Sequence, residues 1–356
     1  MGNEFIRSAQ QLRQAVYGFR CSRIILTAFE LGVFTALAGQ QRTSPQLAKK
    51  IGAAARATDR LLNALCALGL VRKTRNRFAN SKIARELLVD GKPGYLAGLS
   101  HSANQWQSWH TLSEVVRRGT AIIQRQKGPA EEKRLPGFIA AMHERAMPQA
   151  RVIVKLLDLA LVRRCLDIGA GSGAYAMAMA QANNRIRATA FDRPEVLPLT
   201  QSYVRRAGLL SRFDFLAGDF HCDDWGQGYD LILLSAIVHM NSPCENRRLI
   251  ARAARSLNPG GQLVIQDFIM GPDRTQPAVG AIFSLNMLVA TERGDTYTRD
   301  EVRSWMRAAG LEKIRCHKTP FDASLIIGRK TTMTDKNSSR RPRGSTRGEP
   351  CPSSIL

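Results

Sequence analysis

Apolar runs alternate with helical patterns over the second half of this chain. Because buried parallel strands are apolar nearly throughout, while half-exposed strands alternate, such runs predict strands of a mostly parallel sheet. The alternation predicts an α/β fold with a doubly wound, Rossmann-like sheet that binds ligands at the carboxyl ends of its strands. The expected strands are the run ending in Asp167 and residues 185–191, 212–217, 229–235 and 262–267, with a helix at 174–181 and a helix stop and turn at 257–261.

The first 90 residues have mostly helical patterns. Residues 24–37 predict one amphipathic helix, and Thr43-Ser44-Pro45 predicts the start of a second, to Ile51. Thr58-Asp59 predicts the start of a third helix, over 60–68, and the basic segment 73–77 predicts a hairpin turn. Three helices followed by a hairpin are the layout of a winged helix.

The length of 356 residues predicts two domains with accessory segments. The expected parts are a winged-helix-like domain at 1–92, a helical linker at 93–150, an α/β domain at 151–330 and a disordered basic tail at 331–356.

Composition predicts a soluble cytoplasmic protein. Hydrophobic residues make up 44% of the chain, and no stretch reaches the ~20 uninterrupted apolar residues of a membrane span. The N-terminus lacks the order of charged, apolar and small residues that marks a secretory signal. The seven cysteines are scattered and odd in number, so they indicate neither a disulfide framework nor a metal site.

The net charge of +23 is concentrated in the N-terminal half, where residues 1–150 carry 23 Lys and Arg against 9 Asp and Glu. Such an excess can indicate a nucleic-acid partner. We favour a solvated basic surface, because no Arg-rich helix is interleaved with aromatics and aromatic residues are only 6% of the chain.

The segment Asp167-Ile-Gly-Ala-Gly-Ser-Gly173 predicts a strand, a tight turn and a helix start. Gly169, Gly171 and Gly173 let the backbone approach a ligand closely, since glycine has no Cβ. Asp192 ends the next strand, where a carboxylate can accept hydrogen bonds from a ribose diol. The alternative is an ordinary strand-to-helix turn of an α/β domain.

The acid before the glycines distinguishes between cofactors. The carboxylate of Asp167 would repel a phosphate but can help to hold an ammonium group. S-adenosylmethionine has an adenosine end and an amino-acid end, so it fits this pattern better than a dinucleotide does. Polar residues also end the later strands, at Asp219, Ser235 and Asp267.

These motifs resemble those of class I methyltransferases. The resemblance rests on Asp167–Gly173, Asp192–Pro194, Gly218–Phe220, His239 and Asn258–Gly261, and with the N-terminal half it covers roughly residues 10–330. The narrower resemblance is to small-molecule O-methyltransferases with an N-terminal dimerisation domain, the plant phenylpropanoid and bacterial secondary-metabolite enzymes. It implies a homodimer through the N-terminal helices, no bound DNA, and cofactor contacts from Asp167, Gly169, Gly171, Gly173, Asp192, Gly218, Asp219, Phe220 and Ser235.

His239 is the candidate general base. It follows the strand 229–235 on the cofactor side of the sheet, and it matches the catalytic histidine of the family. Asp267, at the end of the next strand, can hold one imidazole nitrogen and orient the other. The family has a longer Glu at that place. The alternative for His239 is a capping or core role.

The resemblance also implies an acceptor pocket. Met287 matches a family methionine that packs against an aromatic acceptor, and its neighbour Asn286 is a second candidate. In the family the segment that corresponds to 94–150 supplies part of the acceptor pocket, so the resemblance also implies contributions to that pocket from Trp106 and Met142. Plain core packing is the alternative for these side chains.

Four residues at three places depart from the plant pattern. Ser235 replaces a lysine, Met240-Asn241 replaces Asp-Trp, and Thr296 stands where the family has a second glutamate. Glu292 and Asp295 are candidate substitutes for that glutamate.

The sequence predicts an S-adenosylmethionine-dependent O-methyltransferase that acts on a small aromatic or polyketide-like hydroxyl. A non-methylating relative that keeps the cofactor, a DNA-binding regulator and a nucleic-acid methyltransferase are the alternatives. Against the last, the strand at 229–235 leads into Ser-Ala-Ile rather than Asn/Asp-Pro-Pro-aromatic, and no Pro-Cys follows it.

Overall fold

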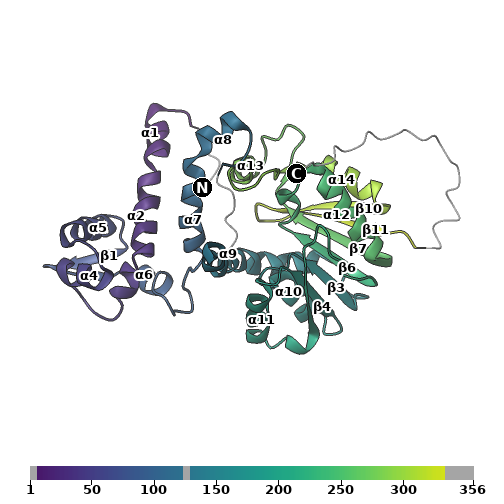
Figure 1. The fold of residues 1–356 in the computed structure, drawn as a ribbon, viewed down its shortest axis with the longest axis horizontal. Helices are drawn as coiled ribbons and strands as arrows, with labels where there is room; N and C mark the ends of the chain where they lie inside the picture. Colours follow the sequence, from purple (N-terminus) through teal and green to yellow (C-terminus); the bar gives the residue numbers. More distant parts are fainter. Residues whose placement is uncertain (1–5, 123–128, 333–356) are drawn as a thin grey trace. The chain divides into compact units, whose positions relative to one another are not determined.

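The computed structural model describes residues 6–122 and 129–332, with the side chains of 129–133 left aside. The chain forms two compact units (Figure 1). Of the described residues, the first unit takes 6–110 and 129–144, and the second takes 111–122 and 145–332. Most of the expected tail, from residue 333 onward, lies outside the described residues.

The first unit is helical with one short hairpin. Its core contains Phe34, Leu47, Leu62, Leu65 and Phe78, all buried. Its elements in chain order are α1 (Ala9–Tyr17), α2 (Phe19–Glu30), α3 (Val33–Ala36), α4 (Ser44–Ile51), α5 (Ala55–Ala67), β1 (Val71–Thr74), β2 (Arg77–Asn80), α6 (Lys82–Leu87) and α7 (Leu99–His110), and α9 (Pro129–Ile153) begins in this unit.

Local sequence signals account for α4 and the hairpin. Thr43 caps α4, which ends at Ile51 as the sequence predicts, and the structure adds a reciprocal capping box with Gln46. Strands β1 and β2 pair antiparallel around the turn at residues 75–76. These features are read correctly from sequence because each depends on residues next to one another in the chain.

Two helix predictions in this unit are wrong. The single helix expected over 24–37 is interrupted, because Gly32 adopts a left-handed conformation (φ 66°) between α2 and α3. The helix expected to start after Thr58 starts at Ala55. The Thr58 hydroxyl donates back to the Ala54 carbonyl (3.0 Å), as an interior threonine does, instead of capping the helix.

The second unit is built on a seven-stranded sheet of order β10-β11-β7-β6-β3-β4-β5. The neighbours from β7 to β5 pair parallel, while β11 pairs antiparallel with both β7 and β10. The strands are β3 (Arg164–Ile168), β4 (Arg187–Asp192), β5 (Phe213–Ala217), β6 (Tyr229–Ser235), β7 (Leu257–Asp267), β10 (Leu311–Lys318) and β11 (Ser324–Lys330). The predicted Rossmann-like α/β fold is confirmed.

Helices cover both faces of this sheet (Figure 1). One face packs on α10 (Ala174–Ala182) and α11 (Leu197–Arg206), and the other on α12 (Pro243–Ser256) and α14 (Arg299–Ala308). The remaining elements are α8 (Leu112–Arg118), the end of α9, α13 (Ala278–Ala290) and the short strands β8 (Ile269–Met270) and β9 (Tyr297–Thr298).

The order of the strands reverses between β3 and β6. The chain runs outward through β4 and β5 and returns to the other side of β3 as β6. In doubly wound sheets the carboxyl ends of the strands at such a reversal form the ligand crevice. The glycine motif follows β3 directly, so it lies at this reversal.

The turn predicted at residues 257–261 is part of a strand in the structure. Helix α12 does end at Ser256, as expected, but β7 already begins at Leu257. The pairing with β6 is irregular between Tyr229↔Leu257 and Leu231↔Gln262, so the predicted turn is a bulge within the strand. Gly260, with φ 79°, supplies the left-handed residue.

Candidate active site

The glycine motif forms the expected tight turn. Gly169, Gly171 and Gly173 all have positive φ angles, of 70°, 54° and 73°, and Gly173 is the N-cap of α10. A Cβ on Gly169 would lie 2.3 Å from Cδ1 of Ile237, so a side chain at Gly169 would displace Ile237 and would also be strained by the positive φ angle.

Asp192 ties this turn to the end of β4. One carboxylate oxygen accepts from the Gly171 N–H (2.7 Å) and the other from the Arg193 N–H (2.8 Å). Burial raises the pKa of Asp192, and these two N–H groups oppose the rise. Each oxygen keeps a second lone pair, which leaves acceptors for a vicinal diol.

Asp167 is a buried carboxylate with an unpartnered oxygen. Its residue is 1% exposed, and Oδ2 has no hydrogen-bond partner. Burial, with the nearby charge of Asp192, raises the pKa of Asp167 to about 7. A buried carboxylate in this state favours a cationic ligand, because a cation would remove the cost of its charge. The orphaned oxygen beside the tight glycine turn therefore fits the ammonium end of S-adenosylmethionine.

The loop after β5 approaches the same edge. The Gly218 N–H donates to the Asp192 carbonyl (3.0 Å), and a Cβ on Gly218 would lie 2.7 Å from Cζ of Phe191. Asp219 is exposed, and its carboxylate accepts from the His221 N–H (2.8 Å). The Phe220 ring is half-buried and packs on the core cluster that lies between the sheet and helices α12 and α14. The three predicted residues thus follow β5, the strand that pairs with β4, at the end where Asp192 lies.

Ser235 is placed differently from its predicted role. Its hydroxyl donates to Oε1 of Gln266 (2.6 Å), in a buried pair across two neighbouring strands. The hydroxyl thus bonds within the protein in this structure, and a role of Ser235 in holding the cofactor stays a prediction.

His239 and Asp267 form a buried pair at the ends of β6 and β7. His239 lies in the 3₁₀ turn Val238–Met240, and its Nδ1 is 2.7 Å from Oδ1 of Asp267. The backbone N–H of His239 donates to Oδ2 (3.2 Å), and the Phe268 N–H donates to Oδ1 (2.8 Å). The shorter Asp therefore reaches the ring.

The electrostatics of this pair keep Asp267 charged. Burial by itself would raise the pKa of Asp267, but the His239 imidazole and the two N–H groups hold it below its ordinary value. Because an ionised carboxylate only accepts hydrogen bonds, we assign the proton on the ring to Nδ1. Nε2 then carries a lone pair that can take a proton.

Two phenylalanine rings lie beside the imidazole. The Phe283 ring lies perpendicular to it at a centroid distance of 4.8 Å, and Phe268 stacks on Phe283 at 4.0 Å. The sequence interpretation missed both phenylalanines. Phe283 stands one helical turn before Met287 on α13, and that spacing was the available signal.

The predicted acceptor residues divide between the two units. Met287 is buried and Asn286 half-buried on α13, in the second unit. Trp106 and Met142 belong to the first unit, where the guanidinium of Arg23 lies 5.6 Å over the Trp106 ring. A contribution of Trp106 and Met142 to an acceptor pocket stays a prediction.

The replaced family positions contain no second carboxylate aimed at the base. Thr296 is buried and donates its N–H to Asp295 (2.7 Å). Asp295 forms an ion pair with Arg274 (3.4 Å), and Glu292 is exposed. The backbone of this loop does contact the base, because the Asp295 N–H donates to the His239 carbonyl (3.0 Å).

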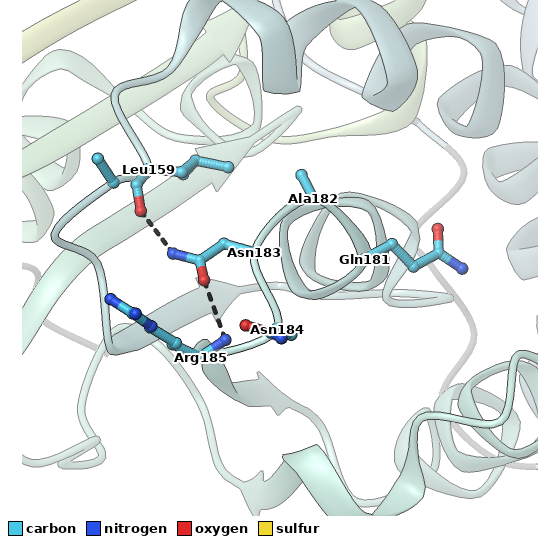
Figure 2. Close-up of a pocket in the computed structure, with 7 residues that line it drawn as sticks. Leu159, Gln181, Ala182, Asn183, Asn184 and Arg185 are labelled. Carbon is cyan, nitrogen blue, oxygen red and sulfur yellow. Dashed lines mark hydrogen bonds between the residues drawn. The ribbon is translucent and has the colours of Figure 1, made fainter.

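A surface hollow of about 500 Å³ lies away from these groups. Figure 2 shows it at the C-terminal end of α10, where the Asn183 amide donates to the Leu159 carbonyl (2.7 Å) and accepts from the Arg185 N–H (2.9 Å). The glycine turn is at the other end of this helix, so the hollow is not part of the site.

Two other properties bear on the setting of the site. Among the described residues, no helix combines the length and apolar character needed to cross a membrane. Cys21, Cys66, Cys165, Cys222 and Cys316 are free thiols.

Comparison with known proteins agrees with the geometry. The family model for an O-methyltransferase domain matches residues 109–312, and that for an O-methyltransferase dimerisation domain matches 14–90.

Two relatives from Streptomyces match most of the chain. A 3-hydroxy-5-methyl-1-naphthoate 3-O-methyltransferase from Streptomyces sahachiroi is 31% identical over 83% of this chain and 87% of its own length. The tetracenomycin polyketide synthesis 8-O-methyltransferase of Streptomyces glaucescens is 31% identical over 90% of this chain and 95% of its own length.

A solved structure supports the cofactor. Human N-acetylserotonin methyltransferase in complex with S-adenosylmethionine is 25% identical, with a TM-score of 0.77 over 93% of this chain and 100% of that one.

Proposed function

The chain belongs to the family of S-adenosylmethionine-dependent O-methyltransferases with a dimerisation domain, and we propose that His239 is its general base and a small aromatic hydroxyl compound its acceptor. The observation that carries the proposal is the buried His239–Asp267 pair at the edge of the sheet where the glycine turn lies.

The cofactor-binding residues follow from the same edge. We assign the ribose diol to the free lone pairs of Asp192, and the ammonium group to the unpartnered oxygen of Asp167. Gly169, Gly171 and Gly173 adopt the positive φ angles that form the tight turn beside these carboxylates. The bound cofactor supplies an electrophilic methyl group on a sulfonium sulfur.

His239 removes the acceptor proton in this proposal. Nε2 would accept the proton of the hydroxyl while that oxygen forms its bond to the methyl carbon and the bond from this carbon to the sulfonium sulfur breaks, and Asp267 would stabilise the imidazolium that results. Phe268 and Phe283 exclude water from one side of the ring, which favours transfer over hydration of the reacting groups.

The aromatic class of the acceptor rests on two observations. Phe283 and Met287 lie on one face of α13, and both suit contact with a planar ring. The names of the two Streptomyces relatives specify a naphthoate and a polyketide pathway as the settings of their own reactions.

We also propose that the protein is a homodimer. Helix α1 buries no residue in the described chain, and Leu12, Val16, Tyr17 and Phe19 are each more than half exposed. Apolar side chains gathered on two consecutive helices of a dimerisation domain favour a subunit interface.

A screen with S-adenosylmethionine carrying a labelled methyl group tests the function. We expect label on a small phenolic compound from a metabolite extract, with the demethylated cofactor released in equal amount. Binding of S-adenosylmethionine without transfer to any phenolic compound would favour a non-methylating relative. Transfer to nucleic acid would overturn the assignment of the acceptor.

A further inference from the structure

Three buried polar side chains and the half-buried Tyr175 form a connected network outside the catalytic pair. Ser235 donates to Oε1 of Gln266 (2.6 Å), and Nε2 of Gln266 donates to Oε1 of Gln149 (2.9 Å). The Tyr175 hydroxyl donates to the same Gln149 oxygen (3.0 Å). A single amide oxygen, on α9, thus joins the first turn of α10 to the ends of β6 and β7.

This network lies on the face of the sheet opposite to the catalytic pair. Successive side chains of a strand point to opposite faces, so Gln266 and its neighbour Asp267 project to different sides of β7. The end of β7 is therefore fixed on both faces, by His239 on one and by Gln149 on the other.

The same face carries the carboxylate assigned to the cofactor. Asp167 pairs in register with Leu233 on the neighbouring strand β6. Ser235 comes two residues after Leu233 and so projects to the same face of the sheet. All three side chains therefore project to the side that α10 covers. Tyr175 comes two residues after Gly173, the last glycine of the turn. Burial raises the pKa of Tyr175 to about 12, and the charge of Asp167 contributes to the rise, as expected for neighbouring groups.

We propose that Gln149 is a positioning residue for the amino-acid end of S-adenosylmethionine, which it serves by fixing Tyr175 beside the glycine turn and Gln266 at the end of β7. The inference rests on the proposed role of Asp167 in holding that end. Loss of the Gln149 oxygen would leave the buried Gln266 amide without this acceptor and would cut the link from the half-buried Tyr175 hydroxyl to α9, so that α10 and the end of β7 would no longer be joined.

The test is calorimetric affinity for S-adenosylhomocysteine, which needs no acceptor molecule. We expect Gln149→Leu to weaken binding by roughly tenfold, because the Gln266 amide and the Tyr175 hydroxyl both lose their shared acceptor. Gln149→Glu keeps oxygen acceptors at the same reach, so it should stay within about threefold of the parent. Tyr175→Phe cuts only the link to α10 and should give a smaller loss than Gln149→Leu.

Gln262→Leu is the matched control. Gln262 is a buried glutamine on the same face of β7, four residues before Gln266, and its amide donates to the Asp158 carbonyl (2.7 Å). Both leucine variants lose a side-chain hydrogen bond and should lower the melting temperature. Only Gln149→Leu should weaken the binding of S-adenosylhomocysteine.

Parent-like affinity in a folded Gln149→Leu, or an equal loss in Gln262→Leu, would overturn the inference. If Gln149→Leu does not fold, Tyr175→Phe decides: a measurable loss supports the positioning role, and unchanged affinity overturns it. The affinity is measured without methyl transfer, so failure of the proposed O-methylation would not decide the role of Gln149. Equally, failure of the positioning role would not decide whether the protein methylates a hydroxyl.

Discussion

Oδ1 of Asp267 lies 2.7 Å from Nδ1 of His239, and its partner oxygen accepts from the backbone N–H of the same histidine. The carboxylate therefore fixes the turn as well as the ring. The backbone contact fixes the position of the residue, and the contact to Nδ1 orients the imidazole, with Nε2 directed away from Asp267.

Asp267→Asn should lower turnover without changing cofactor affinity. The amide is uncharged, so it stabilises an imidazolium less, and it can present N–H to Nδ1 and so favour the wrong tautomer. We expect a smaller loss than for removal of the imidazole. Single-turnover methyl transfer measures it, and Asp273→Asn, an exposed carboxylate after β8, is the control. Parent-like turnover in Asp267→Asn would argue against the orienting role.

Asp192→Ala should weaken S-adenosylmethionine binding by about 1.5–3 kcal/mol, the usual range for hydrogen bonds to a charged group. Calorimetry on the folded variant measures it. Asp214→Ala removes a carboxylate from the neighbouring strand β5, where Asp214 pairs with Arg187 on the surface (2.6 Å), and should leave affinity unchanged. Equal affinity of Asp192→Ala and parent would rule out the ribose assignment.

Asp167 should make the cofactor-free protein less stable as pH rises. Its pKa is about 7 in the folded chain against 3.8 as the ordinary value. The folded state therefore holds a proton that the unfolded state has lost between these values, so stability falls as pH rises through this window. Asp167→Asn should remove that slope, which thermal melts across the window measure.

The same group predicts how cofactor binding depends on pH. A cation binds the ionised carboxylate, so parent affinity should increase from about pH 6 to about pH 7.5 more steeply than that of Asp167→Asn. Identical pH dependence of the two proteins would contradict an interaction between Asp167 and the ammonium group.

Leu12→Glu combined with Val16→Glu should dissociate the dimer. Burying an apolar side chain contributes about 1.5–3 kcal/mol, so two charges in the interface should raise the dimer dissociation constant by at least roughly a hundredfold. Light scattering measures the mass. Ile83→Glu is the control, since Ile83 is equally exposed (53%) but lies on α6. A stable parent monomer at micromolar concentration would contradict the assembly.

The strands and the glycine turn could be predicted because their signals are local. The run Tyr229–Ser235 is apolar nearly throughout, and the structure assigns β6 the same bounds. The break at Gly32 was missed because a glycine is also compatible with a continuous helix, and tertiary packing decides between the two.

The contacts of the site depend on register, which the sequence does not state. Ser235 and Gln266 meet because β6 and β7 pair in parallel at that position, 31 residues apart. Phe283 contacts His239 from α13, which comes after β7 and β8 in the chain. Sequence spacing could place His239 and Asp267 at neighbouring strand ends, but not the partners on the opposite face.

Turnover of His239→Ala against pH, with a phenolic acceptor from the labelled-methyl screen, tests the central proposal most directly. We expect cofactor affinity to be kept and turnover at neutral pH to fall by roughly 10²–10⁴-fold. Because an unperturbed phenol ionises near about pH 10, the variant should recover rate as pH rises and the acceptor loses its proton unaided. Methyl transfer by His239→Ala at the parent rate at neutral pH would contradict the account.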